Sequence, residues 1–192
     1  LGLAVAPFRA VDSLADLEAA VVALGRPSVL KTRRFGYDGK GQIKILPGMD
    51  LAEAHAAIGR SPAVLEGFVT FAREVSIVAA RAADGSFAAF DLCENEHRDH
   101  ILAFTRIPAQ VSAATEATAI AAARKIGAAL GYVGVFAVEM FVVGEGATES
   151  VVVNEIAPRV HNSGHWTSEG ALTSQFHQHV RAVCGFPLGS AQ

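Results

Sequence analysis

The stretch VVVNEIAPRVHNSGHWT, residues 151–167, changes character halfway along its length. Its first half is rich in valine, which is typical of a buried strand. That strand carries Glu155 near its end, and the polar segment 158–166 follows directly. Polar, cationic and small residues directly after a strand are unfavourable in a core and typical of a ligand-binding loop. The sequence therefore predicts a strand that places an acid beside such a loop.

A second acid, Glu139, interrupts the otherwise apolar segment 134–143. Carboxylates are rarely buried without a partner or a cation. If Glu139 and Glu155 lie on neighbouring strands, they repel each other unless Mg²⁺ bridges them. This pattern favours a metal site, with Asn154 beside it. Two alternatives stay open: one acid pairs with an arginine, or both acids face water.

The loop 158–166 adds donors next to the second of these acids. Arg159 offers a planar guanidinium that binds carboxylate or phosphate oxygens in a bidentate manner. His161 and Asn162 add further polar groups. His165 follows His161 by four residues, but the segment lacks a helical pattern, so a zinc pair is not predicted. The alternative is a polar surface loop.

A glycine-rich stretch, FGYDGKGQ at 35–42, follows a short apolar segment that ends in Lys31. Glycines let backbone N–H groups approach phosphate oxygens, and the lysine adds a point charge. No Gly-Lys-Ser/Thr opens a helix, so this is not a Walker motif. The alternative is an ordinary glycine-rich hairpin turn. The candidate residues of this loop are Gly36, Tyr37, Asp38, Gly39, Lys40, Gly41 and Gln42.

A third candidate segment runs from Glu66 through Phe68 and Val69 to Glu74. A short connection between two lobes can offer backbone groups to a planar base, and a nearby carboxylate can bind ribose hydroxyls. The alternative is a linker with a solvated Glu74. His97, in the polar run 94–97, is a further candidate, although such a histidine is more often a surface residue.

Periodicity and capping signals predict an α+β protein with mostly antiparallel sheets. We expect two lobes, 1–66 and 67–192. On the last helix, Leu172, Phe176 and Val180 are expected to form the buried face. The predicted helices are 14–24, 51–58, 113–130 and 167–183; the predicted strands are 28–32, 42–46, 63–66, 73–82, 86–91, 101–107, 134–143 and 151–156.

Composition excludes several classes of protein. Of 192 residues, 51% are hydrophobic and the net charge is −3, which favours a folded domain without a basic nucleic-acid surface. The two cysteines are spaced unlike metal ligands and are expected to be thiols in a reducing cytoplasm. The most apolar stretch, 127–143, is too broken to span a membrane, and no signal peptide is visible. The chain starts at Leu1, which suggests a piece of a longer protein.

Taken together, the lysine, glycine loop, Glu-Gly segment and two acids resemble the ATP-grasp family, in which two lobes clamp ATP. The stretches 35–42 and 154–167 resemble, more narrowly, the N5-carboxyaminoimidazole ribonucleotide synthetases of purine biosynthesis, over essentially the whole chain. That resemblance implies a ligase that uses ATP, Mg²⁺, bicarbonate and 5-aminoimidazole ribonucleotide. It also implies a cytoplasmic homodimer whose N-terminal α/β domain and C-terminal segment are absent from this chain.

The resemblance also implies roles for residues. Tyr37, Asp38 and Arg159 would contact the substrate, Glu139 and Glu155 would bind the metal, and Arg159, His161 and Asn162 would be catalytic. The implied ATP-binding residues are Lys31, Gly36, Tyr37, Asp38, Gly39, Lys40, Gly41, Gln42, Glu66, Phe68, Val69, Glu74, His97, Asn154 and Glu155. Two alternatives remain: a sibling ligase of the glycinamide ribonucleotide transformylase or biotin carboxylase type, and a non-catalytic nucleotide-binding module.

Overall fold

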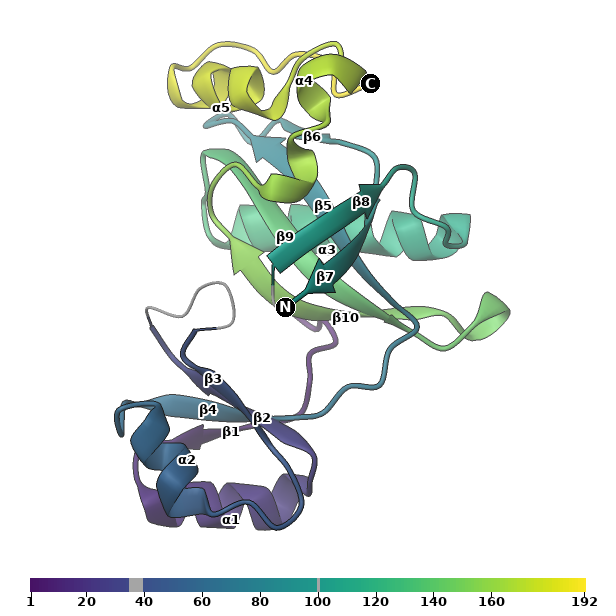
Figure 1. The fold of residues 1–192 in the computed structure, drawn as a ribbon. Helices are drawn as coiled ribbons and strands as arrows, with labels where there is room; N and C mark the ends of the chain where they lie inside the picture. Colours follow the sequence, from purple (N-terminus) through teal and green to yellow (C-terminus); the bar gives the residue numbers. More distant parts are fainter. Residues whose placement is uncertain (35–39, 100) are drawn as a thin grey trace. The chain divides into compact units, whose positions relative to one another are not determined.

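The computed structural model describes residues 1–34, 40–99 and 101–192. The predicted loop positions Gly36, Tyr37, Asp38 and Gly39 therefore lie outside the described residues. The chain forms two compact units (Figure 1). The smaller unit comprises Ala6–Thr70 with Asp99–Ile101, and the larger unit comprises Leu1–Val5, Phe71–Arg98 and Leu102–Gln192.

The smaller unit is an antiparallel sheet of strand order β1-β4-β2-β3 with two helices on one face. Helix α1 begins where predicted, because the Ser13 side chain accepts the Asp16 N–H as an N-cap. Leu17, Leu30 and Leu65 are fully buried between helix and sheet. Its elements are β1 (Phe8–Val11), α1 (Leu14–Leu24), β2 (Ser28–Thr32), β3 (Gln42–Ile45), α2 (Leu51–Ala57) and β4 (Ala63–Gly67).

The larger unit contains a six-stranded sheet of order β10-β9-β5-β7-β8, in which β6 also pairs with β5. The pairings of β5 with β6, β7 and β9, and of β9 with β10, are antiparallel, as predicted. Its strands are β5 (Arg73–Arg81), β6 (Phe87–Ala89), β7 (Cys93–Arg98), β8 (Ile101–Arg106), β9 (Gly134–Val143) and β10 (Ser150–Ala157). Its helices are α3 (Ala113–Ala129), η1 (Gly146–Thr148), η2 (Asn162–Gly164), α4 (Thr167–Gly170) and α5 (Gln175–Val183).

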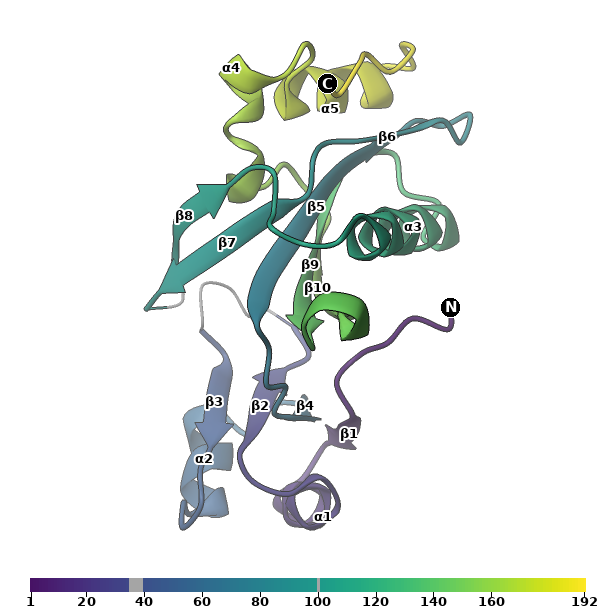
Figure 2. The ribbon, with the colours of Figure 1, turned by 90° about the vertical axis from the view of Figure 1, so that its right-hand side faces the viewer.

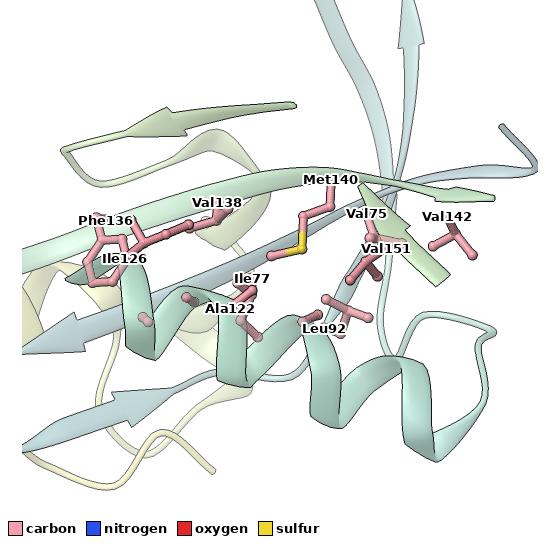
Figure 3. Packing of buried hydrophobic residues seen from close by; sticks show 13 residues of the cluster. Val75, Ile77, Leu92, Ala122, Ile126, Phe136, Val138, Met140, Val142 and Val151 are labelled. Atoms are coloured by element: carbon pink, nitrogen blue, oxygen red, sulfur yellow. The ribbon is translucent and has the colours of Figure 1, made fainter. Parts of the chain in front are cut away.

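Helix α3 packs against one face of this sheet and closes the main core (Figures 2 and 3). Ile126 of α3 lies against Phe136, and Ile77 and Met140 extend the same apolar layer. Gly127 permits this approach, because a Cβ there would lie 2.8 Å from the Phe136 ring. This packing fixes β5 and β9, the two central strands that carry Ser76 and Glu139.

The opposite face of the same sheet has an apolar half and a polar half. The apolar half, which includes Val78, Val135 and Ala137, is buried with Trp166 of the C-terminal segment packed against it. The polar half follows on the same strands, because side chains two residues apart share a face. Its side chains are Glu74, Ser76, Asn95, Glu139 and Glu155.

The last predicted helix is wrong in both extent and orientation. The region 167–183 divides into α4 and α5. Phe176 and Val180 are exposed, as is Leu172, whereas Gln175 and Gln178 are fully buried. The glutamines turn inward because each bonds a backbone segment on both its amide oxygen and its amide nitrogen. These hydrogen bonds outweigh the apolar pattern of the helix.

Two strands, β1 and β7, were not predicted. β7 reads CENEHR, and such a polar sequence carries no strand signal on its own. It forms because β5 and β8 pair with it. In the part of the chain that the structure describes, no helix is long and apolar enough to cross a membrane.

Candidate active site

A β-bulge in β10 brings the two predicted metal acids together. Val153 pairs with Met140, but Glu155 pairs with Glu139, so Asn154 is the extra residue. Without the bulge, Glu139 would face Asn154, and Glu155 would point to the other side of the sheet. Directly opposed residues on antiparallel strands point to the same face. The bulge therefore sets Glu139 and Glu155 side by side.

Glu139 is held by the loop that follows β10. His161 Nε2 lies 2.8 Å from Glu139 Oε1. Burial alone would raise the pKa of Glu139, but the hydrogen bond from His161, with the charges of His97 and Arg159, more than offsets it. The pKa of Glu139 therefore lies below its ordinary value of 4.5, and the acid is ionised at neutral pH.

His97 and Glu74 form a second acid–base pair on the same sheet. His97 Nδ1 lies 2.6 Å from Glu74 Oε2. The hydrogen bond to Glu74 raises the pKa of His97, burial opposes this, and the charges of Glu74, Glu139 and Glu155 reinforce it. The structure thus joins two candidate residues that the sequence indicated separately, Glu74 and His97.

Gln175 fixes the loop that carries His161. Its Oε1 accepts the His161 N–H at 2.9 Å, and its Nε2 donates to the His161 carbonyl at 2.8 Å. Gly164 makes room for this side chain, because a Cβ there would lie 2.6 Å from Gln175 Oε1. Arg159 and Asn162, on either side of His161, are exposed. The loop therefore buries His161 and exposes Arg159 and Asn162 to solvent.

In the smaller unit, Lys31 Nζ and Glu66 Oε2 form a salt bridge at 2.7 Å. β2 pairs with β3 on one side and with β4 on the other, so Lys31 also lies directly opposite Gln42 on the neighbouring strand β3. Lys44 Nζ lies 4.1 Å from the centroid of the Phe68 ring. Strands β2, β3 and β4 of this unit thus carry Lys31, Lys44 and Glu66, and Phe68 follows β4 directly. Lys40 and Gly41 precede β3, and Val69 follows β4.

The donor set suits Mg²⁺ better than zinc. Among residues 1–34, 40–99 and 101–192, no group of three or more His, Cys, Asp or Glu side chains forms a metal cluster. Mg²⁺ commonly uses one or two carboxylates and takes its other ligands from water and phosphate oxygens. Glu139 is ionised and lies opposite Glu155, which meets that requirement.

Comparison with known proteins shows the family of the chain. Residues 1–176 match the model of the ATP-grasp domain. The chain belongs to the ATP-grasp family. Among its relatives, it is 51% identical over 191 residues to the N5-carboxyaminoimidazole ribonucleotide synthase of Brucella melitensis, covering 98% of this chain and 52% of that protein. The ATP-grasp chain thus spans about half the length of the curated relatives that it matches.

Solved structures extend the comparison. An ADP complex of an N5-carboxyaminoimidazole ribonucleotide synthetase superposes with a TM-score of 0.92 at 41% identity, over 100% of this chain and 50% of that one. The Aspergillus clavatus synthase, solved with ADP and 5-aminoimidazole ribonucleotide, gives a TM-score of 0.87 at 32% identity, over 99% and 49%. These likenesses confirm the predicted ATP-grasp fold.

Sequence reasoning missed the side chains beneath the site. Ser76, Asn95 and Ser163 are buried and linked by hydrogen bonds to one another and to His161, which is bonded to Glu139. The one sequence signal for Ser76 is that this polar residue stands in an apolar strand. Nothing in the sequence separates Ser163 from the rest of its polar loop.

Proposed function

We propose that the protein containing this chain uses ATP and bicarbonate to carboxylate 5-aminoimidazole ribonucleotide. The products are N5-carboxyaminoimidazole ribonucleotide, ADP and phosphate. The relatives at 51% and 49% identity are named N5-carboxyaminoimidazole ribonucleotide synthase. The observation that carries the proposal within the chain is the acid pair Glu139 and Glu155, which the β10 bulge sets side by side. His161, in the same loop as Arg159, is bonded to Glu139. We further propose a cytoplasmic homodimer as the intact form.

Glu139 and Glu155 would hold Mg²⁺ in this reaction, with Asn154 beside them at the phosphates. The metal would supply positive charge to the ATP phosphates when bound. Glu139 enters this role already ionised, because His161 and the neighbouring cations lower its pKa. The exposed side chains of Arg159 and Asn162 remain available to contact an anion.

The remaining proposed roles concern the nucleotide. In the smaller unit, which we propose as the lid lobe, Lys31, Lys40, Gly41 and Gln42 would contact phosphates. Glu66 with the backbone of Phe68 and Val69 would contact adenine. In the larger unit, Glu74 would contact ribose, and His97 is paired with it at 2.6 Å. Residues 36–39 keep their proposed contacts with phosphate and substrate, although they lie outside the described residues.

The chemistry needs positive charge, because anionic bicarbonate must approach an anionic γ-phosphate. Phosphorylation of bicarbonate gives carboxyphosphate, a mixed anhydride that the substrate amine can attack with loss of phosphate. Arg159 is suited to bind the three-oxygen anion, since its guanidinium donates in a planar fork. A site that excludes water would protect the anhydride from hydrolysis.

The test is phosphate release by the intact protein with one substrate set at a time. We expect turnover only when ATP, bicarbonate and 5-aminoimidazole ribonucleotide are all present. Turnover with formate and glycinamide ribonucleotide, or with biotin and bicarbonate, would replace this substrate assignment. Tight nucleotide binding without turnover on any set would favour the non-catalytic alternative.

A further inference from the structure

A line of buried hydrogen bonds runs beneath the acid pair. Thr105 Oγ1 donates to Asn95 Oδ1 at 3.2 Å, and Asn95 Nδ2 donates to Ser76 Oγ at 2.8 Å. Ser76 Oγ donates to Ser163 Oγ at 2.7 Å. Since none of these groups has a part in the proposed chemistry, their arrangement needs another explanation. We call the whole line the Ser76 network; its members are Thr105, Asn95, Ser76, Ser163, His161 and Glu139.

The network ends at the two ring nitrogens of His161. Ser163 Oγ lies 2.8 Å from His161 Nδ1, and His161 Nε2 lies 2.8 Å from Glu139 Oε1. The backbone N–H of Ser163 also donates to Nδ1, at 3.3 Å. An atom that accepts an N–H cannot carry a hydrogen pointing along the same direction. Nδ1 is therefore the acceptor nitrogen of the ring.

The direction of every hydrogen bond follows from the two ends. The Asn95 amide gives an N–H to Ser76, so Ser76 is left to donate to Ser163. Ser163 can then donate its own hydroxyl hydrogen to His161. A neutral imidazole that accepts at Nδ1 carries its hydrogen on Nε2. The network thus makes His161 a donor to the Glu139 carboxylate.

The opposite direction would be unfavourable at both ends. It would place the lone pair of His161 Nε2 against the lone pairs of Glu139 Oε1 at 2.8 Å, and an Nδ1 hydrogen against the Ser163 N–H. Burial makes the choice strict: Ser76 is 0% exposed, Ser163 1% and Asn95 8%. Water cannot readily replace a missing partner at such depth, so the network holds as a unit.

We propose that Ser76, Asn95 and Ser163 are positioning residues, which fix His161 as a hydrogen-bond donor and so hold Glu139 for Mg²⁺. This inference rests on the proposed function, because it takes Glu139 as a metal ligand. Both ring nitrogens of His161 are engaged, so His161 acts through Glu139 rather than on the substrate. Partners behind a metal ligand commonly set its orientation and its affinity for the metal.

The first experiment measures the tautomer of His161 in the intact, Mg²⁺-free protein at pH 8. Two-bond ¹H–¹⁵N spectra distinguish a hydrogen on Nε2 from one on Nδ1, and His161→Gln assigns the signals. The matched control is Ser28→Ala, because Ser28 is also 0% exposed but its hydroxyl has no hydrogen-bond partner among the described residues. We expect the Nε2–H form in the wild type and in Ser28→Ala. In Ser76→Ala, the Ser163 hydroxyl no longer receives a hydrogen from Ser76 and can accept one from His161 Nδ1. We therefore expect some Nδ1–H form in Ser76→Ala, beside the Nε2–H form that the Ser163 N–H and Glu139 still favour.

The second experiment titrates Mg²⁺ in the presence of ADP and follows the thermal unfolding temperature. Ser76→Ala should weaken the apparent Mg²⁺ affinity about tenfold, the lower end for partners behind a metal ligand. Ser28→Ala should leave it unchanged. Ser163→Ala, which removes the hydroxyl donor but keeps the backbone N–H, serves if Ser76→Ala does not fold.

The outcomes separate the two levels of the proposal. An Nδ1-protonated His161 in the wild type, or an unchanged tautomer in both alanine variants, overturns the network. A changed tautomer with unchanged Mg²⁺ affinity overturns its role toward Glu139. Failure of the intact wild type to turn over the proposed substrates refutes the proposed function instead, while the spectra still decide the direction of the network.

Discussion

Gln175 offers the sharpest test of how the loop of the active site is held. Its buried amide bonds both the N–H and the carbonyl of His161, at 2.9 and 2.8 Å. Gln175→Ala leaves the His161 N–H without a partner, whereas the His161 carbonyl still accepts the Gly164 N–H at 3.0 Å. A buried unsatisfied group costs about 1–3 kcal/mol. We therefore expect the free energy of unfolding to fall by about 1–3 kcal/mol, as measured by urea denaturation.

Gln178→Ala is a matched control for this change. Gln178 lies on the same helix, is equally buried, and bonds both backbone groups of Gly189, at 3.0 and 2.6 Å. Gln178→Ala should lose at least as much stability as Gln175→Ala, because it removes the side-chain partner of both Gly189 backbone groups. Only Gln175→Ala should also lower ADP formation, on the order of tenfold or more, because it frees the loop of His161. Equal activity in the two variants, or a stability loss below about 0.5 kcal/mol for Gln175→Ala, would refute this reasoning.

Three further predictions concern other parts of the chain. Of the two thiols, Cys184 is exposed, whereas burial raises the pKa of Cys93 to about 11. A thiol reagent at pH 8 should therefore modify only Cys184 in the native protein, as followed by mass spectrometry. Modification of Cys93 at the same rate would contradict its burial. The pKa of His97 is raised in the folded state, so the pairing of His97 with Glu74 stabilises the fold fully below about pH 6.5, and this stabilisation is lost as pH rises through the folded-state pKa. The urea midpoints of wild type and His97→Gln should therefore converge above the folded-state pKa. A difference between the two midpoints that widens with pH would contradict this direction of the pKa shift. Gly127→Ala should cost about 1–3 kcal/mol of unfolding free energy through overpacking against the ring beneath it, and an unchanged thermal midpoint would show that α3 can shift.

Most of the fold follows from local sequence signals. The Ser13 cap, the apolar segments of β2, β9 and β10, and the alanine-rich α3 each need only neighbours in sequence. The antiparallel pairing of β5 with β6 follows from the Asp84-Gly85 turn between them. Elements that depend on contacts with distant parts of the chain were not predicted. β7 is polar and forms because its neighbours β5 and β8 pair with it.

The same division holds for the candidate site. Glu139 and Glu155 were predicted as metal ligands because a carboxylate in an apolar strand is conspicuous. Their alignment depends on the bulge at Asn154, which shifts the register by one residue and has no sequence signal of its own. The pairing of Glu139 with His161 joins residues 22 apart, and only the fold brings them together. On α5, the glutamines turn inward because their backbone partners lie far along the chain.

The central claim is that Glu155 and Glu139 together hold the Mg²⁺ that an ATP-dependent carboxylation needs. The most direct measurement is ADP formation by intact wild type and Glu155→Gln, with ATP, Mg²⁺, bicarbonate and 5-aminoimidazole ribonucleotide present. The variant removes one negative charge at nearly constant volume, and circular dichroism checks that its fold is kept. We expect ADP formation to fall to background in the variant. Near-normal ADP formation by the folded variant would contradict the account.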